Sequence, residues 1–128
     1  MTPTLTISLL LLALVGLDAT GDAFRFLNRQ VLHHAMEVLM IAGFIALWAF
    51  FPFEPVYIII YILGRLWLFD VLWNVITGQN PLYIGTSDLY GRSVRWIGEK
   101  LRVSYMHFSF MIKFMSFMAW IGLIIRFK

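Results

Sequence analysis

The sequence predicts an all-α integral membrane protein, a bundle of four transmembrane helices with a short cytoplasmic amphipathic helix at the membrane surface. Of the 128 residues, 61% are hydrophobic and 13% are charged, whereas soluble domains carry about 25% charged residues. Four apolar stretches approach the roughly 20 residues that cross a bilayer. A fifth stretch combines apolar and basic stripes with a helical period. We therefore expect a single membrane domain over residues 1–128.

The first two spans are expected at about residues 4–20 and 31–51. No Lys or Arg precedes the apolar core of the first span, so we expect a retained helix rather than a cleaved signal peptide. This span is short. If it does not cross, the N-terminus moves to the cytoplasm and the other spans keep their orientation. Pro52 and Pro55 end the second span, because proline cannot continue a helix.

The last two spans are expected at about residues 56–77 and 105–125. Gly78 is a suitable C-terminal cap for the third span, and Pro81 follows just beyond it. No water reaches unpaired backbone groups in the hydrocarbon core, so every span must be helical.

Between these two spans, residues 88–103 are expected to form an amphipathic helix in the membrane surface. Its apolar stripe consists of Tyr90, Val94, Ile97 and Leu101. Its basic residues, which we predict to bind anionic lipid headgroups, are Arg92, Arg95, Lys100 and Arg102. Ser87 or Asp88 is the expected N-terminal cap. The alternative, an extension of the fourth span into water, stays open because Gly91 and Gly98 both weaken the helix.

Basic residues are distributed unequally between the two sides of the predicted bundle. The loops at residues 21–30 and 78–104 fall on one side and hold six Lys and Arg residues, whereas the other side holds Arg126 and Lys128. Because cytoplasmic loops are enriched in Lys and Arg, we expect both loops in the cytoplasm and both termini outside. The setting that fits is the bacterial inner membrane.

Polar side chains within and beside the spans form the candidate functional cluster. At 1.5 Å per residue, nearly all of the ionisable ones fall in the cytoplasmic half, while the opposite half is almost purely apolar. The cluster consists of Asp18, Asp22, His33, His34, Glu37, Arg65, Asp70, Asn74, His107 and Lys113. The expected pairs are Glu37 with Lys113, Asp70 with Arg65 or a histidine, and Asp18 or Asp22 with Arg25 or His34.

Three interpretations of this cluster stay open. The first is structural: opposite charges neutralise each other and fix the helix register, and the protein is a scaffold or accessory subunit of a membrane assembly. The second is an oligomeric ion or proton conduit, because histidines and carboxylates in one layer are typical of such paths. The third is a metal-dependent membrane enzyme. We favour them in that order and predict no cofactor.

The metal interpretation rests on four residues that offer nitrogen and oxygen ligands for zinc, iron or manganese. They are His34, Glu37, Asp70 and His107. The chain has no cysteine, no HExxH sequence and no paired ExxH motif of the di-iron bundles. His107 is also expected to lie near the surface. We therefore assign neither metal ligands nor catalytic residues.

The expected partners are the bilayer, with its anionic headgroups, and further copies of the chain or a larger membrane complex. A bundle of this size has little interior, and Arg65 and Lys113 require burial against protein rather than lipid. Ala42, Gly43 and Ala46 offer a face for close helix packing. Nucleic acid is not expected, because the basic loop has few basic residues and faces lipid headgroups.

Three stretches, LDATGDAFR…LHH, LGRLWLFDVLWNVITG and YIGTSDLYGR, resemble a group of uncharacterised small multi-span membrane proteins of bacteria, notably Bacteroidetes, and of their phages. The resemblance covers most of the chain, implies a multi-span helical protein and assigns no activity. It draws attention to Asp22, His34, Asp70, Asn74, Tyr83, Gly85 and Asp88. A phage origin implies one further option, a pore-forming holin. Holins usually carry a strongly charged tail, whereas this chain ends in RFK.

Overall fold

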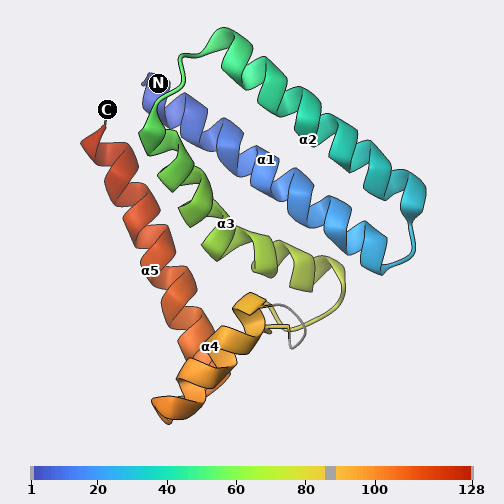
Figure 1. Cartoon of the computed structure of the whole chain (residues 1–128), viewed down its shortest axis with the longest axis vertical. Helices are drawn as coiled ribbons and strands as arrows, with labels where there is room; N and C mark the ends of the chain where they lie inside the picture. Colours follow the sequence, from blue (N-terminus) through green and yellow to red (C-terminus); the bar gives the residue numbers. More distant parts are fainter. Residues whose placement is uncertain (1, 86–88, 128) are drawn as a thin grey trace.

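The structure, a computed structural model, describes residues 2–85 and 89–127, which form helices joined by turns and loops. The helices are α1 (Pro3–Phe26), α2 (Gln30–Phe50), α3 (Pro55–Ile76), α4 (Leu89–Lys100) and α5 (Tyr105–Arg126) (Figure 1). Within the described residues, α1, α2, α3 and α5 are long and apolar enough to cross a membrane. The predicted fold class is confirmed, and the chain is a small polytopic membrane protein.

Residues at the helix ends account for where the helices begin and stop. The Thr2 side chain accepts a hydrogen bond from the Leu5 N–H at 3.3 Å and caps α1. This helix continues to Phe26, beyond the predicted limit at residue 20, so its polar C-terminal turns are helical as well. After α3, Gly78 adopts a φ of 77°, the left-handed conformation expected of a C-terminal cap.

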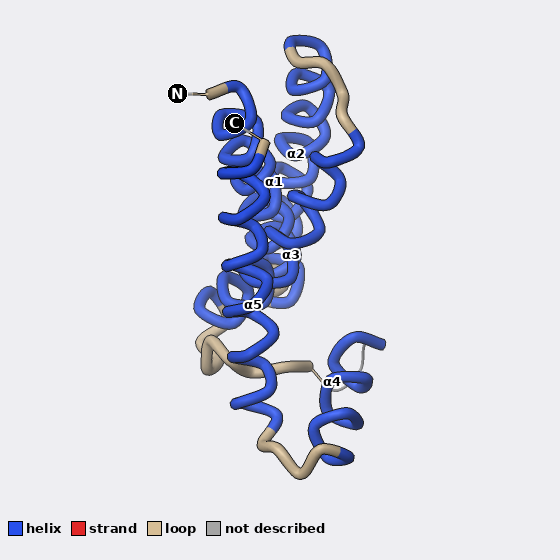
Figure 2. The backbone as a smooth tube through the Cα atoms, turned by 90° about the vertical axis from the view of Figure 1, so that its left-hand side faces the viewer, coloured by secondary structure: helices blue, strands red, loops and turns tan. Residues whose placement is uncertain are grey.

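The long helices pack in the order α2, α1, α3, α5, so that α1 and α3 lie in the middle (Figures 1 and 2). Gly64 explains how α3 fits between α1 and α5: an added Cβ there would lie 3.3 Å from Leu12 and 3.6 Å from Trp120. The core residues come from all four long helices and are Ile7, Leu11, Leu14, Leu47, Tyr57, Ile60, Trp120 and Ile124. Within the described part of the chain, the backbone of α2 lies next to that of α1 alone and does not reach α5. Towards the other end of α2, the rings of Phe44 and Trp48 also contact Tyr61 and Tyr57 of α3.

The small residues of α2 divide between two faces. Gly43 faces α1, where an added Cβ would lie 2.5 Å from Leu14 Cδ2. Ala42 and Ala46 are exposed. Gly43 therefore lets α2 pack closely against α1 within the chain. From the sequence, it had been expected on one face with Ala42 and Ala46, available for packing against another copy or partner.

The helix α4 packs against the first turns of α5 (Figure 2). It buries Gly91, Val94 and Gly98, and an added Cβ at Gly98 would lie 3.2 Å from the Val103 carbonyl oxygen. A turn with Arg102 at φ 56° separates it from α5, so α4 is a helix of its own and not an extension of the fourth span. The proposed caps Ser87 and Asp88 lie outside the described residues.

Candidate functional site

Two ion pairs connect α1, α3 and α5 at the level of the predicted polar cluster. Arg65 Nη1 pairs with Asp18 Oδ2 and joins α3 to α1. Lys113 Nζ lies 3.7 Å from Asp70 Oδ2 and joins α5 to α3. Counted along the helices, Asp18, Asp70 and Lys113 lie about 9 to 12 Å from the helix ends near the polar loops. The cluster therefore ties neighbouring helices together.

Lys113 is the most enclosed charge of this layer. Its side chain is 7% exposed, and its ammonium group donates a hydrogen bond of 2.8 Å to Ser109 Oγ. A cation inside a span requires such partners, because lipid offers none. Ser109 was not predicted as a member of the cluster, although its position four residues before Lys113 places it on the same helix face.

The predicted pair of Glu37 with Lys113 is wrong. The two residues lie at similar depth, but α1 and α3 stand between α2 and α5. Lys113 pairs with Asp70 instead, and Glu37 lies beside His33 and His34 of its own helix. Asp18 pairs with Arg65 rather than with Arg25 or His34.

A cavity opens beside this layer, between α1, α3 and the chain that leads into α4. We call it the polar cavity. Its lining residues are Asp22, Arg65, Phe69, Asp70, Trp73, Asn74, Tyr83, Gly85 and Tyr90. A second cavity shares Arg65, Phe69, Asp70 and Tyr90 with it and reaches along α3 past Leu66 to Ile62. Acidic, basic, amide and aromatic side chains thus converge on one opening, four of them from the predicted cluster.

Buried hydrogen bonds hold the wall of the polar cavity in place. Asn74 is 2% exposed, and its amide nitrogen donates to the carbonyl oxygens of Pro81 at 3.2 Å and Tyr83 at 2.7 Å. Arg95 of α4 donates to the Ile84 carbonyl oxygen at 2.7 Å. Asn74 is therefore a structural residue that folds the segment after α3 back against the helix.

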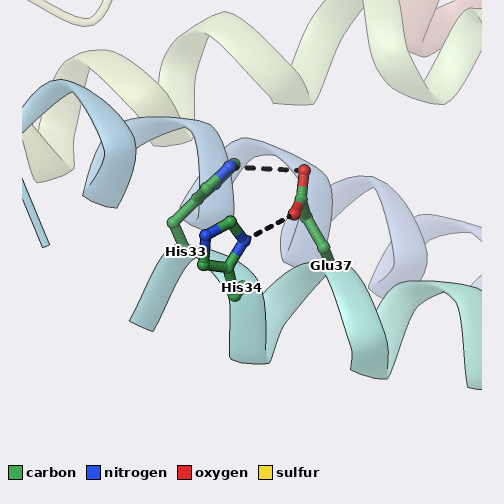
Figure 3. Close-up of side chains that lie close together, drawn as sticks. All are labelled: His33, His34 and Glu37. Carbon is green, nitrogen blue, oxygen red and sulfur yellow. Dashed lines mark hydrogen bonds and ion pairs between the residues drawn. The ribbon is translucent and has the colours of Figure 1, made fainter. Parts of the chain in front are cut away.

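A second polar group lies at the start of α2 and consists of His33, His34 and Glu37, which we call the His–Glu cluster (Figure 3). His33 Nε2 lies 3.3 Å from Glu37 Oε1, and His34 Nδ1 lies 3.2 Å from Glu37 Oε2. Through its other ring nitrogen, Nδ1, His33 hydrogen-bonds to the Gly21 carbonyl oxygen of α1 at 2.8 Å. The spacings of three and four residues place these side chains on one face of the helix.

Comparisons with known proteins do not assign the chain to a family. No protein-family model, curated protein or solved structure matches the chain. Among the residues that the sequence resemblance singles out, five line the polar cavity: Asp22, Asp70, Asn74, Tyr83 and Gly85. His34 belongs to the His–Glu cluster instead, and Asp88 lies outside the described residues.

The four metal ligands considered from the sequence do not come together. Among the described residues, His33, His34 and Glu37 form the group of His, Asp and Glu side chains that could hold a metal ion together. Their ligand atoms lie within 4.8 Å of one another. Asp70 pairs with Lys113 on the other side of α1. His107 is exposed on α5, which α2 does not contact. The expected position of His107 near the surface already counted against it in the sequence, and the helix order adds that its helix does not contact α2.

The basic residues of α4 and of the turn after it divide into two kinds. Arg92, Lys100 and Arg102 are exposed, and the ammonium group of Lys100 lies 5.7 Å from the ring centre of Trp96. The guanidinium group of Arg95 is instead held within the protein, 4.1 Å from the ring centre of Tyr105 and hydrogen-bonded to Ile84. Arg95 thus holds α4 in place, and headgroup binding by the other three stays a prediction.

Proposed function

We propose that this protein is a scaffold or accessory subunit of a membrane assembly, and that a protein partner covers the face that carries Arg65. One observation supports this: the Arg65 side chain is 45% exposed, although the residue lies at the middle of the span Pro55–Ile76. A charge at the centre of a membrane helix costs roughly 2.5 to 3.5 kcal/mol on insertion scales. Contact with protein lowers that cost.

The partners of Arg65 within the chain neutralise its charge but leave part of its side chain uncovered. Asp18 supplies the counter-charge, but its own side chain is 24% exposed. The Arg65 guanidinium group lies 4.2 Å from the ring centre of Phe69 and is covered on that side. Lys113, by contrast, is enclosed within the chain. The ion pair of Arg65 and Asp18 therefore marks the face that a partner would cover.

The surface around Arg65 has the composition of an interface. Ile62, one turn before Arg65 on α3, is 50% exposed. The polar cavity beside it is lined by Phe69, Trp73 and Tyr90, and aromatic side chains and arginine are enriched in protein interfaces. The partner is a second copy of this chain or another membrane protein.

An oligomeric conduit is the second candidate, and the polar cavity favours it. Copies that meet at the Arg65 face would bring Asp22 and Asp70 around a shared space. The other half of α3, from Val56 to Leu63, has no charged residue, so a path through the assembly would require water in an apolar section. For this reason the scaffold is the preferred proposal.

Photo-crosslinking tests the proposal. A photo-reactive residue replaces Ile62 or Phe69 on the Arg65 face, and Ile45, which is 67% exposed on α2, serves as the control. The experiment uses membranes of the cells that make the protein and vesicles that contain the purified chain alone. We expect discrete protein adducts from residues 62 and 69 and none from residue 45. Adducts in both preparations identify a second copy, and adducts in cell membranes alone identify another protein.

The absence of a discrete adduct from residues 62 and 69 in both preparations would contradict the proposal. Equal adducts from residue 45 would do the same, because they would report random encounters in the membrane. Arg65→Leu is the accompanying variant. It should weaken the adduct from residue 62 while leaving the helical circular-dichroism spectrum unchanged.

We also propose that the loop between α1 and α2, together with α4, faces the cytoplasm of a bacterial inner membrane. The support is the excess of Lys and Arg on that side. Arg25, Arg29, Arg92, Lys100 and Arg102 are all exposed, as residues at a headgroup surface would be.

A further inference from the structure

We propose that the His–Glu cluster at the start of α2 binds a divalent transition-metal ion of the zinc class, with His33 Nε2, His34 Nδ1 and Glu37 as ligands. The cluster lies on the opposite side of α1 from the Asp70–Lys113 pair. The proposed metal ligands are not residues of the Arg65 face, so this proposal does not rest on the proposed assembly.

The proton on His33 is the first observation that carries the proposal. The Gly21 carbonyl oxygen can only accept a hydrogen bond, so His33 Nδ1, at 2.8 Å, must donate. In a neutral imidazole, Nε2 then has a lone pair and no proton. That lone pair faces the Glu37 carboxylate at 3.3 Å. Two acceptor atoms therefore face each other, as two ligands of one metal ion would.

The same hydrogen bond is typical of metal-binding histidines. A histidine ligand usually donates its second ring N–H to a backbone carbonyl or a carboxylate, which fixes the tautomer and the ring orientation. His33 is held in this way at 8% exposure. Gly21 allows the close approach of α2, because an added Cβ there would lie 3.0 Å from Met36 Cβ. The His33 ring is therefore oriented by α1 before any ion binds.

Two of the separations between donor atoms match the spacing around a tetrahedral ion. Bonds of about 2.1 Å place neighbouring ligand atoms about 3.4 Å apart around tetrahedral zinc. His33 Nε2 lies 3.3 Å from Glu37 Oε1, and His34 Nδ1 lies 3.2 Å from Glu37 Oε2. The ligand atoms of the three residues lie within 4.8 Å of one another, so small side-chain rotations would close the site around one ion. Two imidazole nitrogens with one carboxylate suit zinc, nickel or copper, whereas magnesium and calcium prefer oxygen ligands. Three protein ligands leave a fourth position for water.

The surroundings leave the ion accessible. The His34 and Glu37 side chains are 68% and 49% exposed, and a small cavity beside His33 and Glu37 is lined by Asp18, Asp22 and Arg25 of α1. Asp18 is paired with Arg65, so Asp22 is the aspartate that adds negative charge around a divalent cation, and Arg25 offsets it in part. The ion would join the start of α2 to the end of α1 through His33 and its bond to Gly21.

Zinc binding to the full-length chain tests this site, in detergent micelles and without a histidine tag. The chain has three histidines and no cysteine, so His107→Gln is a matched control on another helix. Equilibrium dialysis with metal analysis should find one zinc ion per chain in the wild type and in His107→Gln. His34→Gln and Glu37→Gln should each bind at least about tenfold more weakly, because loss of an outer-shell partner alone costs about 10- to 100-fold.

Cobalt provides a second readout, because its visible absorption reports the coordination geometry. The wild type should give a tetrahedral Co²⁺ spectrum that zinc abolishes, and His34→Gln should not. Both substituted side chains are exposed, and thermal melts without metal should match the wild type. No zinc bound by the wild type, or equal weakening in His107→Gln, would overturn the proposal.

Discussion

Lys113 Nζ on α5 lies 3.7 Å from Asp70 Oδ2 on α3 with its side chain 7% exposed, so the counter-charge of a lysine within a span comes from the neighbouring helix. Ser109 adds a hydrogen bond from one turn away. Together with the pair of Arg65 and Asp18, this contact fixes α3 between α1 and α5. The two ion pairs of the polar layer therefore help to hold α1, α3 and α5 together.

Removal of either charge from the Asp70–Lys113 pair should destabilise the bundle. Asp70→Asn takes the counter-charge from an enclosed ammonium group, and leaving such a group without its partner costs roughly 1 to 3 kcal/mol. Lys113→Met should destabilise as well. The double substitution should recover a large part of the loss, because breaking a buried pair costs more than removing it. Reversible unfolding in mixed micelles measures the four free energies of this cycle.

Glu37→Gln is the control for that cycle. Glu37 lies at similar depth on α2, which does not contact α5. Its effect should therefore add to that of Lys113→Met, as expected of distant and independent sites. A coupling between these two substitutions as large as that between residues 70 and 113 would contradict the helix order.

Much of the architecture could be predicted from the sequence, because it depends on local chemistry. Apolar length places the spans, Pro55 begins α3 and Gly78 follows its end. The pairs within the polar layer depend on which helices are neighbours. That order depends on contacts such as Gly43 with Leu14 and Gly64 with Leu12, which hydropathy and spacing do not reveal. Their similar depth in the membrane suggested Glu37 as the ion-pair partner of Lys113, although α1 and α3 separate the two helices that carry them.

The His–Glu cluster was predictable only in part. The spacing of His33, His34 and Glu37 places them on one face. The hydrogen bond from His33 to Gly21 comes from packing between α1 and α2, and it is this bond that assigns the His33 proton. The aromatic lining of the polar cavity was not predicted either, because Tyr83 and Tyr90 reach it through the fold of the segment after α3.

Gly43→Leu should separate α1 from α2 and lower stability. An added Cβ already meets Leu14 Cδ2 at 2.5 Å, and larger groups forced into a packed contact typically cost about 1 to 3 kcal/mol. Ala42→Leu is the matched control, because Ala42 is exposed on the same helix. Thermal unfolding should show a clear loss for Gly43→Leu and little change for Ala42→Leu. Equal effects would mean that the Leu14 side chain moves aside at little cost and that Gly43 is not required for the packing of α2 on α1.

Ser93→Cys should react with thiol reagents only from the cytoplasmic side. Ser93 is exposed on α4, and the chain has no native cysteine that would interfere. A membrane-impermeant maleimide should label this variant in inverted vesicles and not in intact cells. Labelling in intact cells would place α4 outside and reverse the proposed orientation.

Neutralising the exposed basic residues near α4 should reduce its contact with anionic lipid. Each basic residue near an anionic surface contributes about 1 kcal/mol, or up to about fivefold in lipid partitioning. Arg92→Gln, Lys100→Gln and Arg102→Gln should lower the anionic-lipid enrichment of the purified protein step by step. Glu99→Gln, on the same helix, should not lower it. Arg95→Gln should instead lower thermal stability, because Arg95 binds the Ile84 carbonyl oxygen.

The central claim is that protein rather than lipid covers the Arg65 face within the membrane. Oxygen accessibility of a spin label tests it most directly, because oxygen concentrates in the lipid hydrocarbon. Ile62→Cys and Ile45→Cys place labels on two exposed isoleucines of α3 and α2, 50% and 67% exposed in the single chain, at about the same distance from the same membrane surface.

The measurement is made in reconstituted vesicles and in native membranes. We expect low oxygen accessibility at residue 62 and high accessibility at residue 45, with the difference reduced by Arg65→Leu. Equal, lipid-like accessibility at both positions in both preparations would contradict it and leave Arg65 facing the bilayer.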